Sequence, residues 1–306
     1  MNAKKRVLVL GATGMLGHMV RRVLAESAVI DVEGTHVCEK GDPFYCDVTA
    51  GLDDLEAICD RTPRYDYFIN CIGILPAGIS GSDPATIRKA IKINSLFPHE
   101  LSTLAKEREA RVIHISTDGV FSGQAEIYYE DAAHDCQDLY GITKSLGEVI
   151  DGHFLNLRCS IIGPSPYLGK GLMEWFLRQP GHSTVSGYTN HIWHGVSTYQ
   201  FAHLCLKIIR DDHFENLRRE AAVFHFAPNE PIAKYDLLCL FQSIFKSNVN
   251  IQPVASDDKT YRRILRTRYQ ALQQIYPYGI SAVDMVSELA AYMKDNRGQY
   301  HEGNIG

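Results

Sequence analysis

The sequence lacks the features of a membrane or exported protein. No stretch of its 306 residues approaches the ~20 consecutive apolar residues that a membrane-spanning helix requires. The apolar run that follows Arg6 ends at Gly11, short of the roughly 7 to 15 apolar residues of a secretion signal. We therefore expect a cytoplasmic protein that makes no contact with a membrane.

An excess of basic residues is also missing. The 31 Lys and Arg residues are outnumbered by 36 Asp and Glu, which gives a net charge of −5. Proteins that bind nucleic acid through its phosphates usually carry a basic excess. The composition therefore argues against a nucleic-acid partner, although it leaves room for a local basic pocket.

Closely spaced cysteine pairs are absent as well. The eight cysteines are dispersed without a C-x-x-C motif, in a chain long enough to fold without disulfides, so we expect reduced thiols. His134 with Cys136, and His191 with His194, each lack a second pair at the spacing of a metal site. We expect no bound metal.

The first half of the chain alternates two kinds of hydrophobic pattern. Short β-branched runs predict strands at 6–10, 29–35, 67–71, 111–116 and 154–159. Longer amphipathic stretches between them predict helices at 14–26, 52–60, 85–107 and 138–151. This alternation is typical of an α/β fold, a Rossmann-type doubly wound parallel sheet.

The second half has a looser pattern, rich in Pro and Gly after residue 160. Helices are expected at 172–178, 197–210, 231–246 and 281–294. We predict an NAD(P)-binding Rossmann domain over 1–160 and a smaller mixed α/β substrate lobe over 161–295. Part of that lobe can return to the sheet, and residues 296–306 are expected to form a flexible tail.

Three glycines follow the first predicted strand at the spacing G-x-x-G-x-x-G and open a helix. A turn without Cβ atoms lets a pyrophosphate approach the free N–H groups of a helix N-terminus. The alternative is a glycine-rich turn that binds nothing, but its position after the first strand favours a dinucleotide. The expected cofactor contacts here are Gly11, Thr13, Gly14, Met15, Leu16 and Gly17.

The end of the second strand indicates which dinucleotide is bound. NAD is usually held there by a carboxylate on the ribose, whereas basic groups suit the 2′-phosphate of NADP. Here the strand ends in Thr35 and His36 with Lys40 nearby, which favours NADPH over NADH unless a register shift brings Glu33 or Glu39 to that place. Asp47 and Val48 are expected beside the adenine.

Tyr140 and Lys144 lie four residues apart in a predicted helix, so they share one face. An ammonium group beside a phenol lowers its pKa from about 10, which suits proton transfer near neutral pH. Thr117 lies at the end of the preceding predicted strand and offers a hydroxyl to a substrate carbonyl. A tyrosine–lysine pair alone is more often a surface pair, but here it accompanies the glycine turn.

With these motifs the chain resembles the extended short-chain dehydrogenase/reductase family, in particular its dTDP-4-dehydrorhamnose reductase type. The similar segments are GATGMLG at 11–17, STDGVFSG at 116–123, YYED at 128–131, YGITKSLGE at 140–148 and the R-x-x-x-x-G-P pattern at 158–164. The likeness covers about the first 165 residues. Beyond them only 193–202 and 224–227 look similar.

The resemblance implies that NAD(P)H reduces the C4 ketone of a nucleoside-diphosphate 4-keto-6-deoxy sugar while Tyr140 protonates its oxygen. Lys144 would hold the ribose, Thr117 would orient the carbonyl and Asn94 would complete a proton relay. Tyr140 and Lys144 thereby also contact the cofactor. The other cofactor contacts expected from it are Cys71, Ile72, Gly73, Ser116, Ser160 and Ile161.

A nucleotide-sugar substrate also needs cations for its diphosphate. The dense basic cluster at 259–268 offers them, although a solvated helix face is an equal alternative for such a run. The aromatic segment 187–194 offers groups that stack on or bond to a sugar or base. The expected substrate contacts are Asp118, Val120, Phe121, Arg158, Asn190, Trp193, Arg263 and Arg266.

One departure from the family bears on the reaction. The related 4,6-dehydratases carry an Asp-Glu pair after the threonine, whereas Asp118 is followed here by Gly119, so reduction is favoured over dehydration. Two alternatives stay open: a nucleotide-sugar epimerase of the same fold, and a non-catalytic dinucleotide-binding regulatory subunit like that of methionine adenosyltransferase. A homodimer is compatible with the reductase and with both alternatives.

Overall fold

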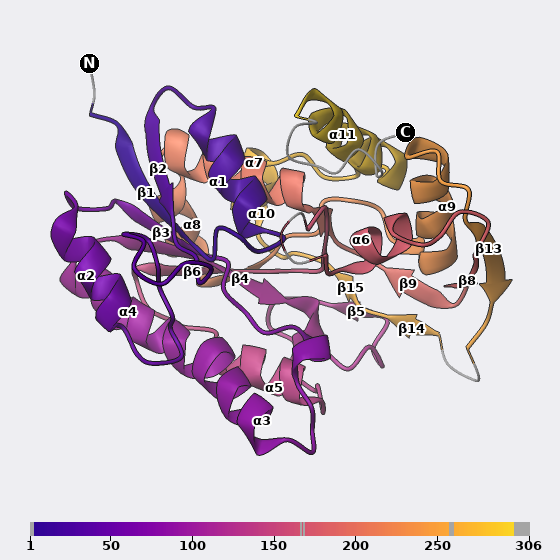
Figure 1. Ribbon diagram of the computed structural model, residues 1–306, viewed down its shortest axis with the longest axis horizontal. Coiled ribbons are helices and arrows are strands. Elements are labelled where there is room, and N and C mark those ends of the chain that lie inside the picture. Colours follow the sequence, from indigo (N-terminus) through magenta and orange to yellow (C-terminus); the bar gives the residue numbers. More distant parts are fainter. Residues whose placement is uncertain (1–2, 166, 168, 257–259, 297–306) are drawn as a thin grey trace.

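Six parallel strands form the main sheet of the protein, whose computed structural model describes residues 3–165, 167, 169–256 and 260–296 (Figure 1). The strand order is β11-β6-β4-β3-β1-β2. The strands are β1 (Lys5–Leu10), β2 (Ile30–Gly34), β3 (Tyr67–Asn70), β4 (Arg111–Thr117), β6 (Phe154–Cys159) and β11 (Val223–His225). The predicted doubly wound α/β fold is confirmed.

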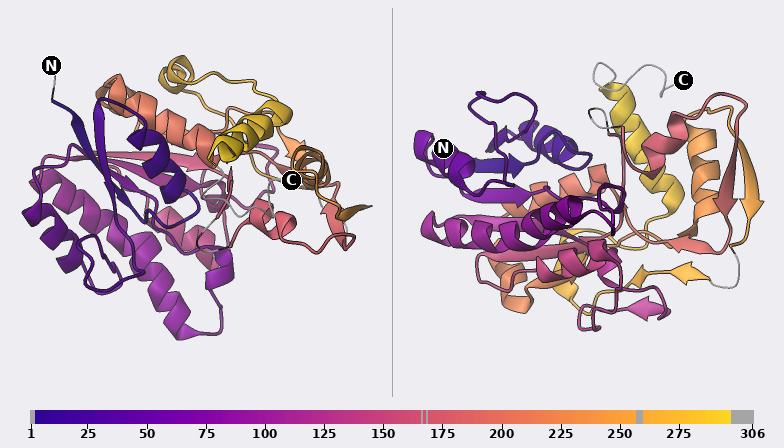
Figure 2. Two further views of the ribbon diagram at one scale, coloured as in Figure 1. Left: turned by 45° about the horizontal axis from the view of Figure 1, so that its top comes forward. Right: turned by 60° about the horizontal axis from the view of Figure 1, so that its bottom comes forward.

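Helices cover both faces of this sheet (Figures 1 and 2). One face carries α1 (Gly17–Ala25), α7 (Thr198–Arg210) and α8 (Phe214–Glu220), and the other α2 (Asp53–Arg61), α4 (Phe97–Glu107) and α5 (Leu139–Leu146). Because side chains alternate along a strand, Val7 and Val9 join the first core while Leu8 and Leu10 join the second. Two-sided burial explains why apolar residues occupy most positions in the middle of the sheet, where β1 reads Val-Leu-Val-Leu and β3 reads Tyr-Phe-Ile.

The long helix predicted over 85–107 is broken into three pieces. They are α3 (Pro84–Ala90), the π-helical η2 (Ile91–Leu96) and α4. Pro98 has no N–H to donate to the carbonyl of Asn94, and Gly147 packs so closely that a Cβ there would lie 1.9 Å from that oxygen. The same contact lies at the end of α5, which stops at Leu146 rather than at the predicted residue 151.

The rest of the chain forms a smaller lobe of short strands and helices at the right of Figure 1. Its strand pairs are β10–β7, β13–β8 and β15–β5, with a three-stranded sheet β12-β9-β14. The strands are β5 (Ile127–Tyr128), β7 (Ile161–Ile162), β8 (Thr184–Tyr188), β9 (His191–Trp193), β10 (Val196–Ser197), β12 (Ile232–Ala233), β13 (Asn250–Val254), β14 (Tyr261–Arg262) and β15 (Ile264–Leu265). The helices of the lobe are α6 (Leu172–Leu177), α9 (Lys234–Ile244) and α11 (Ala282–Asp295), whereas α10 (Gln270–Ile275) packs against α7 and α8. Two one-turn 3₁₀ segments, η1 (Pro76–Gly78) and η3 (Asp118–Val120), follow β3 and β4.

The chain does return from this lobe to the sheet. Strand β11 pairs with β6, and α7 packs along α1, although both come from the region after residue 160. The helical alternative for the basic cluster is wrong, because none of its described residues, 260–268, is helical and four of them form β14 and β15. Lys259 and residues 297–306 of the expected tail lie outside the described residues.

Among the described residues, no helix is long and apolar enough to cross a membrane. The same residues contain no group of three or more His, Cys, Asp and Glu side chains that would hold a metal ion. All eight cysteines are free thiols.

Candidate active site

A cavity of about 330 Å³ opens at the carboxyl ends of β1, β3, β4 and β6. This is where the strand order reverses, because β2 and β3 lie on opposite sides of β1, and such switch points bind ligands in open α/β sheets. The predicted residues that line it are Gly14, Met15, Leu16, Cys71, Ile72, Gly73, Ser116, Thr117, Asp118, Tyr140, Lys144, Ser160 and Ile161. The cavity therefore collects most of the predicted cofactor contacts.

The glycine turn forms one end of this cavity. Gly14, Met15 and Leu16 line it, whereas Gly11 and Gly17 do not. Gly11 has a φ of 78°, in the region that favours glycine, and a Cβ on Gly17 would lie 2.2 Å from the carbonyl oxygen of Gly11. Thr13 is in the turn but does not line the cavity. Helix α1 begins without a side-chain cap, which leaves N–H groups of its first turn for an anion.

We expect Gly17→Ala to weaken dinucleotide binding at least tenfold, because the added methyl group meets backbone that cannot turn aside. Quenching of intrinsic fluorescence by NADPH measures the dissociation constant. Gly152→Ala is the matched control, since a Cβ there meets nothing within 4 Å. Equal affinities of the two variants would contradict the close packing of the turn.

The end of β2 lies against the glycine turn. The Oγ1 of Thr35 accepts a hydrogen bond from the N–H of Gly11 at 3.1 Å, and Nε2 of His36 lies 3.0 Å from Asp42. Asp47 accepts from Thr49, and Val48 is buried. None of these four predicted cofactor residues lines the main cavity, which the glycine turn borders only through Gly14, Met15 and Leu16.

Tyr140 and Thr117 meet at the wall between the main cavity and a second cavity of about 560 Å³. Asp138 caps α5 by accepting from the N–H of Gly141 at 2.8 Å, which fixes Tyr140 in the first turn. A Cβ on Gly119 would lie 2.9 Å from the Tyr140 ring and 3.2 Å from Oγ1 of Thr117. The absence of a side chain at Gly119 thus lets the phenol ring pack on the turn after β4.

Burial controls the pKa values of the tyrosine–lysine pair. It raises the pKa of Tyr140 to about 12, with a hydrogen bond from Thr117 acting in the opposite direction. The expectation that this pKa is lowered is wrong, because Lys144 donates instead to the carbonyl oxygen of Ile115 at 2.8 Å. Burial also lowers the pKa of Lys144 to about 8, against the opposing charge of Glu148.

Two buried polar side chains that the sequence analysis did not predict, His114 and Asn70, lie in a chain of contacts behind Lys144. His114 Nε2 lies 3.4 Å from its Nζ, and His114 Nδ1 lies 3.0 Å from the amide of Asn70. Burial holds the pKa of His114 well below its usual value, which keeps the ring neutral. A polar residue inside each of two buried strands, β3 and β4, was the signal that would have revealed them.

Asn94 does not line the cavity. Its side chain accepts from the N–H of Ile74 at 2.8 Å and donates to the carbonyl of Ile74 at 3.0 Å and to Oγ1 of Thr143 at 3.2 Å. These contacts hold the loop after β3, which does line the cavity, against α5. The structure shows Asn94 as a residue that positions this loop rather than one in contact with Tyr140.

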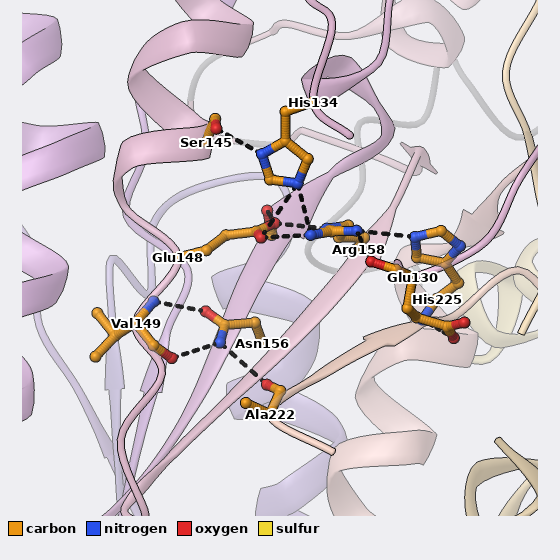
Figure 3. Close-up of polar contacts among 10 residues, drawn as sticks. Glu130, His134, Ser145, Glu148, Val149, Asn156, Arg158, Ala222 and His225 are labelled. Carbon is orange, nitrogen blue, oxygen red and sulfur yellow. Dashed lines mark hydrogen bonds and ion pairs between the residues drawn. The ribbon is translucent and has the colours of Figure 1, made fainter. Parts of the chain in front are cut away.

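Arg158 belongs to a buried network and not to a cavity wall (Figure 3). Its Nε and Nη2 each donate to Glu148 at 2.7 Å, and Nη2 lies 2.6 Å from His134. Its other donors reach the backbone of Glu130 and the ring of His225. The prediction that Arg158 contacts substrate is wrong, because the guanidinium has no donor left to offer.

The other predicted substrate residues lie in the core, outside the cavity walls, or on a cavity wall. Val120 and Phe121 are fully buried, and Phe121 stacks on Tyr128 with ring centroids 4.3 Å apart, so neither lines the cavities. Arg266 is exposed and Asn190 bonds to Ser256; these two also lie outside the cavity walls. Trp193 donates to Ser160 at 2.9 Å and, with Arg263, lines a third cavity of about 150 Å³.

A sequence-family model settles the classification of this chain. The model for the RmlD substrate binding domain matches residues 5–274. The chain belongs to this family. The resemblance predicted from the motifs is therefore confirmed.

Curated relatives of this RmlD-family chain carry two kinds of name. Over 144 residues it is 31% identical to the probable low-salt glycan biosynthesis reductase Agl14 of Haloferax volcanii, and this match spans 46% of each chain. It is 24% identical to methionine adenosyltransferase 2 subunit beta of Xenopus tropicalis, over 83% of this chain and 76% of that one. It therefore spans only about half of the reductase but most of the subunit.

Solved structures confirm the fold of the family. A dTDP-4-dehydrorhamnose reductase from Clostridium acetobutylicum matches with a TM-score of 0.73 at 19% identity, covering 94% of this chain and 99% of that one. One from Bacillus anthracis, in complex with NADP, has the same TM-score at 16% identity, with 94% and 99% covered. Identities this low show a shared fold, not a shared substrate.

Proposed function

We propose that the protein is an NAD(P)H-dependent reductase of a nucleoside-diphosphate 4-keto-6-deoxy sugar. The observation that carries this proposal is the shared wall, where Thr117 and Tyr140 face both the cavity beside the glycine turn and the 560 Å³ cavity. A substrate ketone at that wall meets a hydroxyl donor on one side and a dinucleotide site on the other. The names of several relatives agree with this chemistry.

A bound dinucleotide supplies the hydride, and the residues of this chain manage the proton. Because the pKa of Tyr140 is about 12, its phenol stays protonated at neutral pH and is ready to protonate the alkoxide that forms at C4. Thr117 orients the carbonyl oxygen toward that phenol. Lys144, held by Ile115 and His114, presents its ammonium group beneath the same wall.

We propose NADPH as the preferred cofactor, on the residues around the end of β2. Arg21 lies across Gly34, where a Cβ would be 2.8 Å from its Cδ. The nearby carboxylate of Glu33 is held by Arg6 at 3.2 Å and by Tyr65. An arginine in this place suits a 2′-phosphate, and no strand-end carboxylate is left for a ribose hydroxyl.

Arg21→Leu is expected to weaken NADPH binding about tenfold and to leave NADH binding unchanged, since one charged contact to the 2′-phosphate is lost. Calorimetric titration with NADPH, NADH and 2′,5′-ADP measures the three affinities. Arg219→Leu, another exposed arginine, is the control. Equal losses for NADPH and NADH would show that Arg21 acts on the fold of the turn instead.

The reductase activity is expected to depend on pH through Lys144, whose pKa is about 8. Its ammonium form is present below that pH and is lost as the pH rises through its pKa. With saturating NADPH, kcat/KM should therefore fall above about pH 8, while Lys144→Arg, which stays charged, should lack that limb. A wild-type profile that is flat up to pH 10 would refute the role of this ammonium group.

A direct assay tests the proposed reaction. The protein is mixed with NADPH and with dTDP-, UDP- and GDP-linked 4-keto-6-deoxy sugars, and the loss of cofactor absorbance is followed. Oxidation of NADPH with one of these sugars, together with a 4-hydroxy product, supports the proposal. No oxidation with any of them would overturn it.

The regulatory-subunit alternative has its own support, because the match to the methionine adenosyltransferase subunit spans 83% of this chain. If that reading holds, the protein would capture a stoichiometric partner and reduce none of the keto sugars. The epimerase alternative predicts that the purified protein retains NAD and interconverts 4-hydroxy sugars without net oxidation of cofactor.

A further inference from the structure

The phenol of Tyr140 has one proton to give, and the proposed reduction consumes one in every turnover. A ketone that is reduced gains a hydride at carbon and a proton at oxygen, so the phenolate left on Tyr140 must be protonated again before the next turnover. Because the pKa of Tyr140 is about 12, this protonation is favourable at neutral pH. The fold has to supply only a route for the proton.

The polar contacts behind Lys144 do not supply this route. Its Nζ donates to the carbonyl oxygen of Ile115 and lies against His114, whose ring contacts Asn70. The side chains of His114 and Asn70 are completely buried, and burial holds the pKa of His114 far below its usual value. This chain of contacts ends inside the sheet, so it does not connect Tyr140 with solvent.

The contacts of Asn94 do not supply the route either. Its amide reaches the backbone of Ile74 and Oγ1 of Thr143. That hydroxyl in turn donates to the backbone carbonyl oxygens of Leu139 and Tyr140, at 2.8 and 3.0 Å. A carbonyl oxygen has no proton to pass on, so this second chain of contacts stops at the backbone of α5 without reaching the phenol.

A third chain of contacts leaves the phenol through Thr117. Its Oγ1 is hydrogen-bonded to Tyr140, accepts the N–H of Gly119 at 3.0 Å and donates to the carboxylate of Asp118 at 3.3 Å. Hydrogen bonds at such sites are often long before a ligand binds and shorten in its presence. A hydroxyl that lies between a phenol and a carboxyl group gives a proton to one while it takes a proton from the other.

Asp118 brings this path to open space. It lines the cavity beside the glycine turn, the 560 Å³ cavity and the 150 Å³ cavity. The ionisable groups that face it are Arg263 and Lys234 of the smaller lobe, Tyr140 of α5 and Cys159 of β6. Burial raises the pKa of Asp118 against the opposing charge of Arg263, so this carboxyl group carries a proton more often than an exposed aspartate does.

We infer that Asp118, acting through Thr117, returns to Tyr140 the proton that the phenol gives to the substrate. The inference rests on the proposed function and assigns the source of its proton. The alkoxide at C4 takes the phenolic proton, the phenolate takes the hydroxyl proton of Thr117, and Thr117 takes the carboxyl proton of Asp118. Solvent that enters the adjoining cavities then protonates the carboxylate, so each cycle consumes one hydride and one solvent proton.

Rapid-mixing kinetics test this path, because the first turnover does not need it. The protein saturated with NADPH is mixed with the accepted keto sugar, and the loss of cofactor absorbance is followed. Asp118→Asn should oxidise the first equivalent of NADPH at the wild-type rate, since Tyr140 starts protonated, and should perform later turnovers about 10- to 100-fold more slowly. Asp131→Asn, which removes the same charge from an exposed ion pair with Arg268, should match the wild type in both phases.

A second variant separates a lost proton carrier from a changed fold. Asp118→Ala should show the same slow later turnovers. Formate, a small acid that fits the space of the missing carboxyl group, should accelerate them, whereas chloride at the same concentration should not. Slowing of the first turnover as much as the later ones, later turnovers of Asp118→Asn at the wild-type rate, or no effect of formate would each overturn the path.

A titration without turnover distinguishes failure of the path from failure of the proposed reaction. Carbon-13 NMR of the full chain with labelled aspartate carboxyl groups and bound NADP⁺ measures the pKa of Asp118, with Asp118→Asn identifying its signal. Thr117→Val removes the donor to this carboxylate and should raise that pKa further. If the wild type oxidises no NADPH with any keto sugar, the proposed reaction is removed; an Asp118 titration that Thr117→Val leaves unmoved overturns the path itself.

Discussion

Tyr140→Phe is expected to lower kcat by about 10² to 10⁴-fold, the usual contribution of a positioned general acid. The phenylalanine ring keeps the contact with Gly119, and only the hydroxyl that faces Thr117 is lost. Affinity for NADPH and the melting temperature should therefore stay near the wild-type values. Steady-state kinetics with the accepted keto sugar, fluorescence titration and thermal melting measure the three quantities.

Tyr199→Phe is the matched control, because Tyr199 packs against Tyr292 on the opposite helical layer, away from the cavities. It should leave kcat unchanged. Turnover of Tyr140→Phe within threefold of the wild type would remove Tyr140 from the chemistry. The proton would then have to come from solvent or from Thr117, the other hydroxyl at the wall.

Local motifs explain why part of the site was predictable. The glycine turn, Thr117 and the Tyr140–Lys144 pair each follow from spacing within one strand or helix, and parallel strands place their carboxyl ends at one edge. The sheet was predictable for the same reason, because strands buried on both faces are continuous apolar runs. The structure brings these residues together around one cavity.

Contacts between distant segments explain the failures. Arg158 looked like a substrate ligand because its acceptor, Glu148, is identifiable only once β6 and the end of α5 are side by side. The contacts of Asn94 were not predictable for the same reason, because they join the π-helical turn to Ile74 in the loop after β3 and to Thr143 in α5. Lys234, the first residue of α9, stands in no motif, and only the folding of the smaller lobe brings it to a cavity that Asp118 also lines.

The second large effect is expected for Arg158→Met, which should lower the free energy of unfolding by about 3 to 5 kcal/mol. Glu148 and Arg158 are both almost fully buried, with side-chain exposures of 6% and 4%. Removing the guanidinium leaves a buried carboxylate whose remaining side-chain donor is Ser116, at 2.5 Å. The ring of His134 lies 3.7 Å from the same carboxylate (Figure 3). Urea unfolding followed by circular dichroism measures the change.

The pH dependence of unfolding identifies the cause of that loss. Burial alone would raise the pKa of Glu148, but the hydrogen bonds and charge of Arg158 outweigh it and lower the pKa in the folded protein. A lowered folded pKa stabilises the wild type above the unfolded pKa of about 4.3, and this stabilisation is lost as the pH falls through the folded value. In Arg158→Met the folded pKa should rise instead, so the variant should lose stability as the pH increases toward neutrality.

A double variant separates the buried charge from the packing. Arg158→Met with Glu148→Leu removes both charges, and replacing a whole buried pair by apolar groups is often close to neutral. We therefore expect the double variant to recover most of the stability that Arg158→Met loses. Arg210→Met, which breaks the exposed pair with Asp211, should change the unfolding free energy by less than about 1 kcal/mol. If the double variant is instead as unstable as Arg158→Met, the contacts of Arg158 with His134, His225 and the backbone of Glu130 hold this part of the fold, and the ion pair does not.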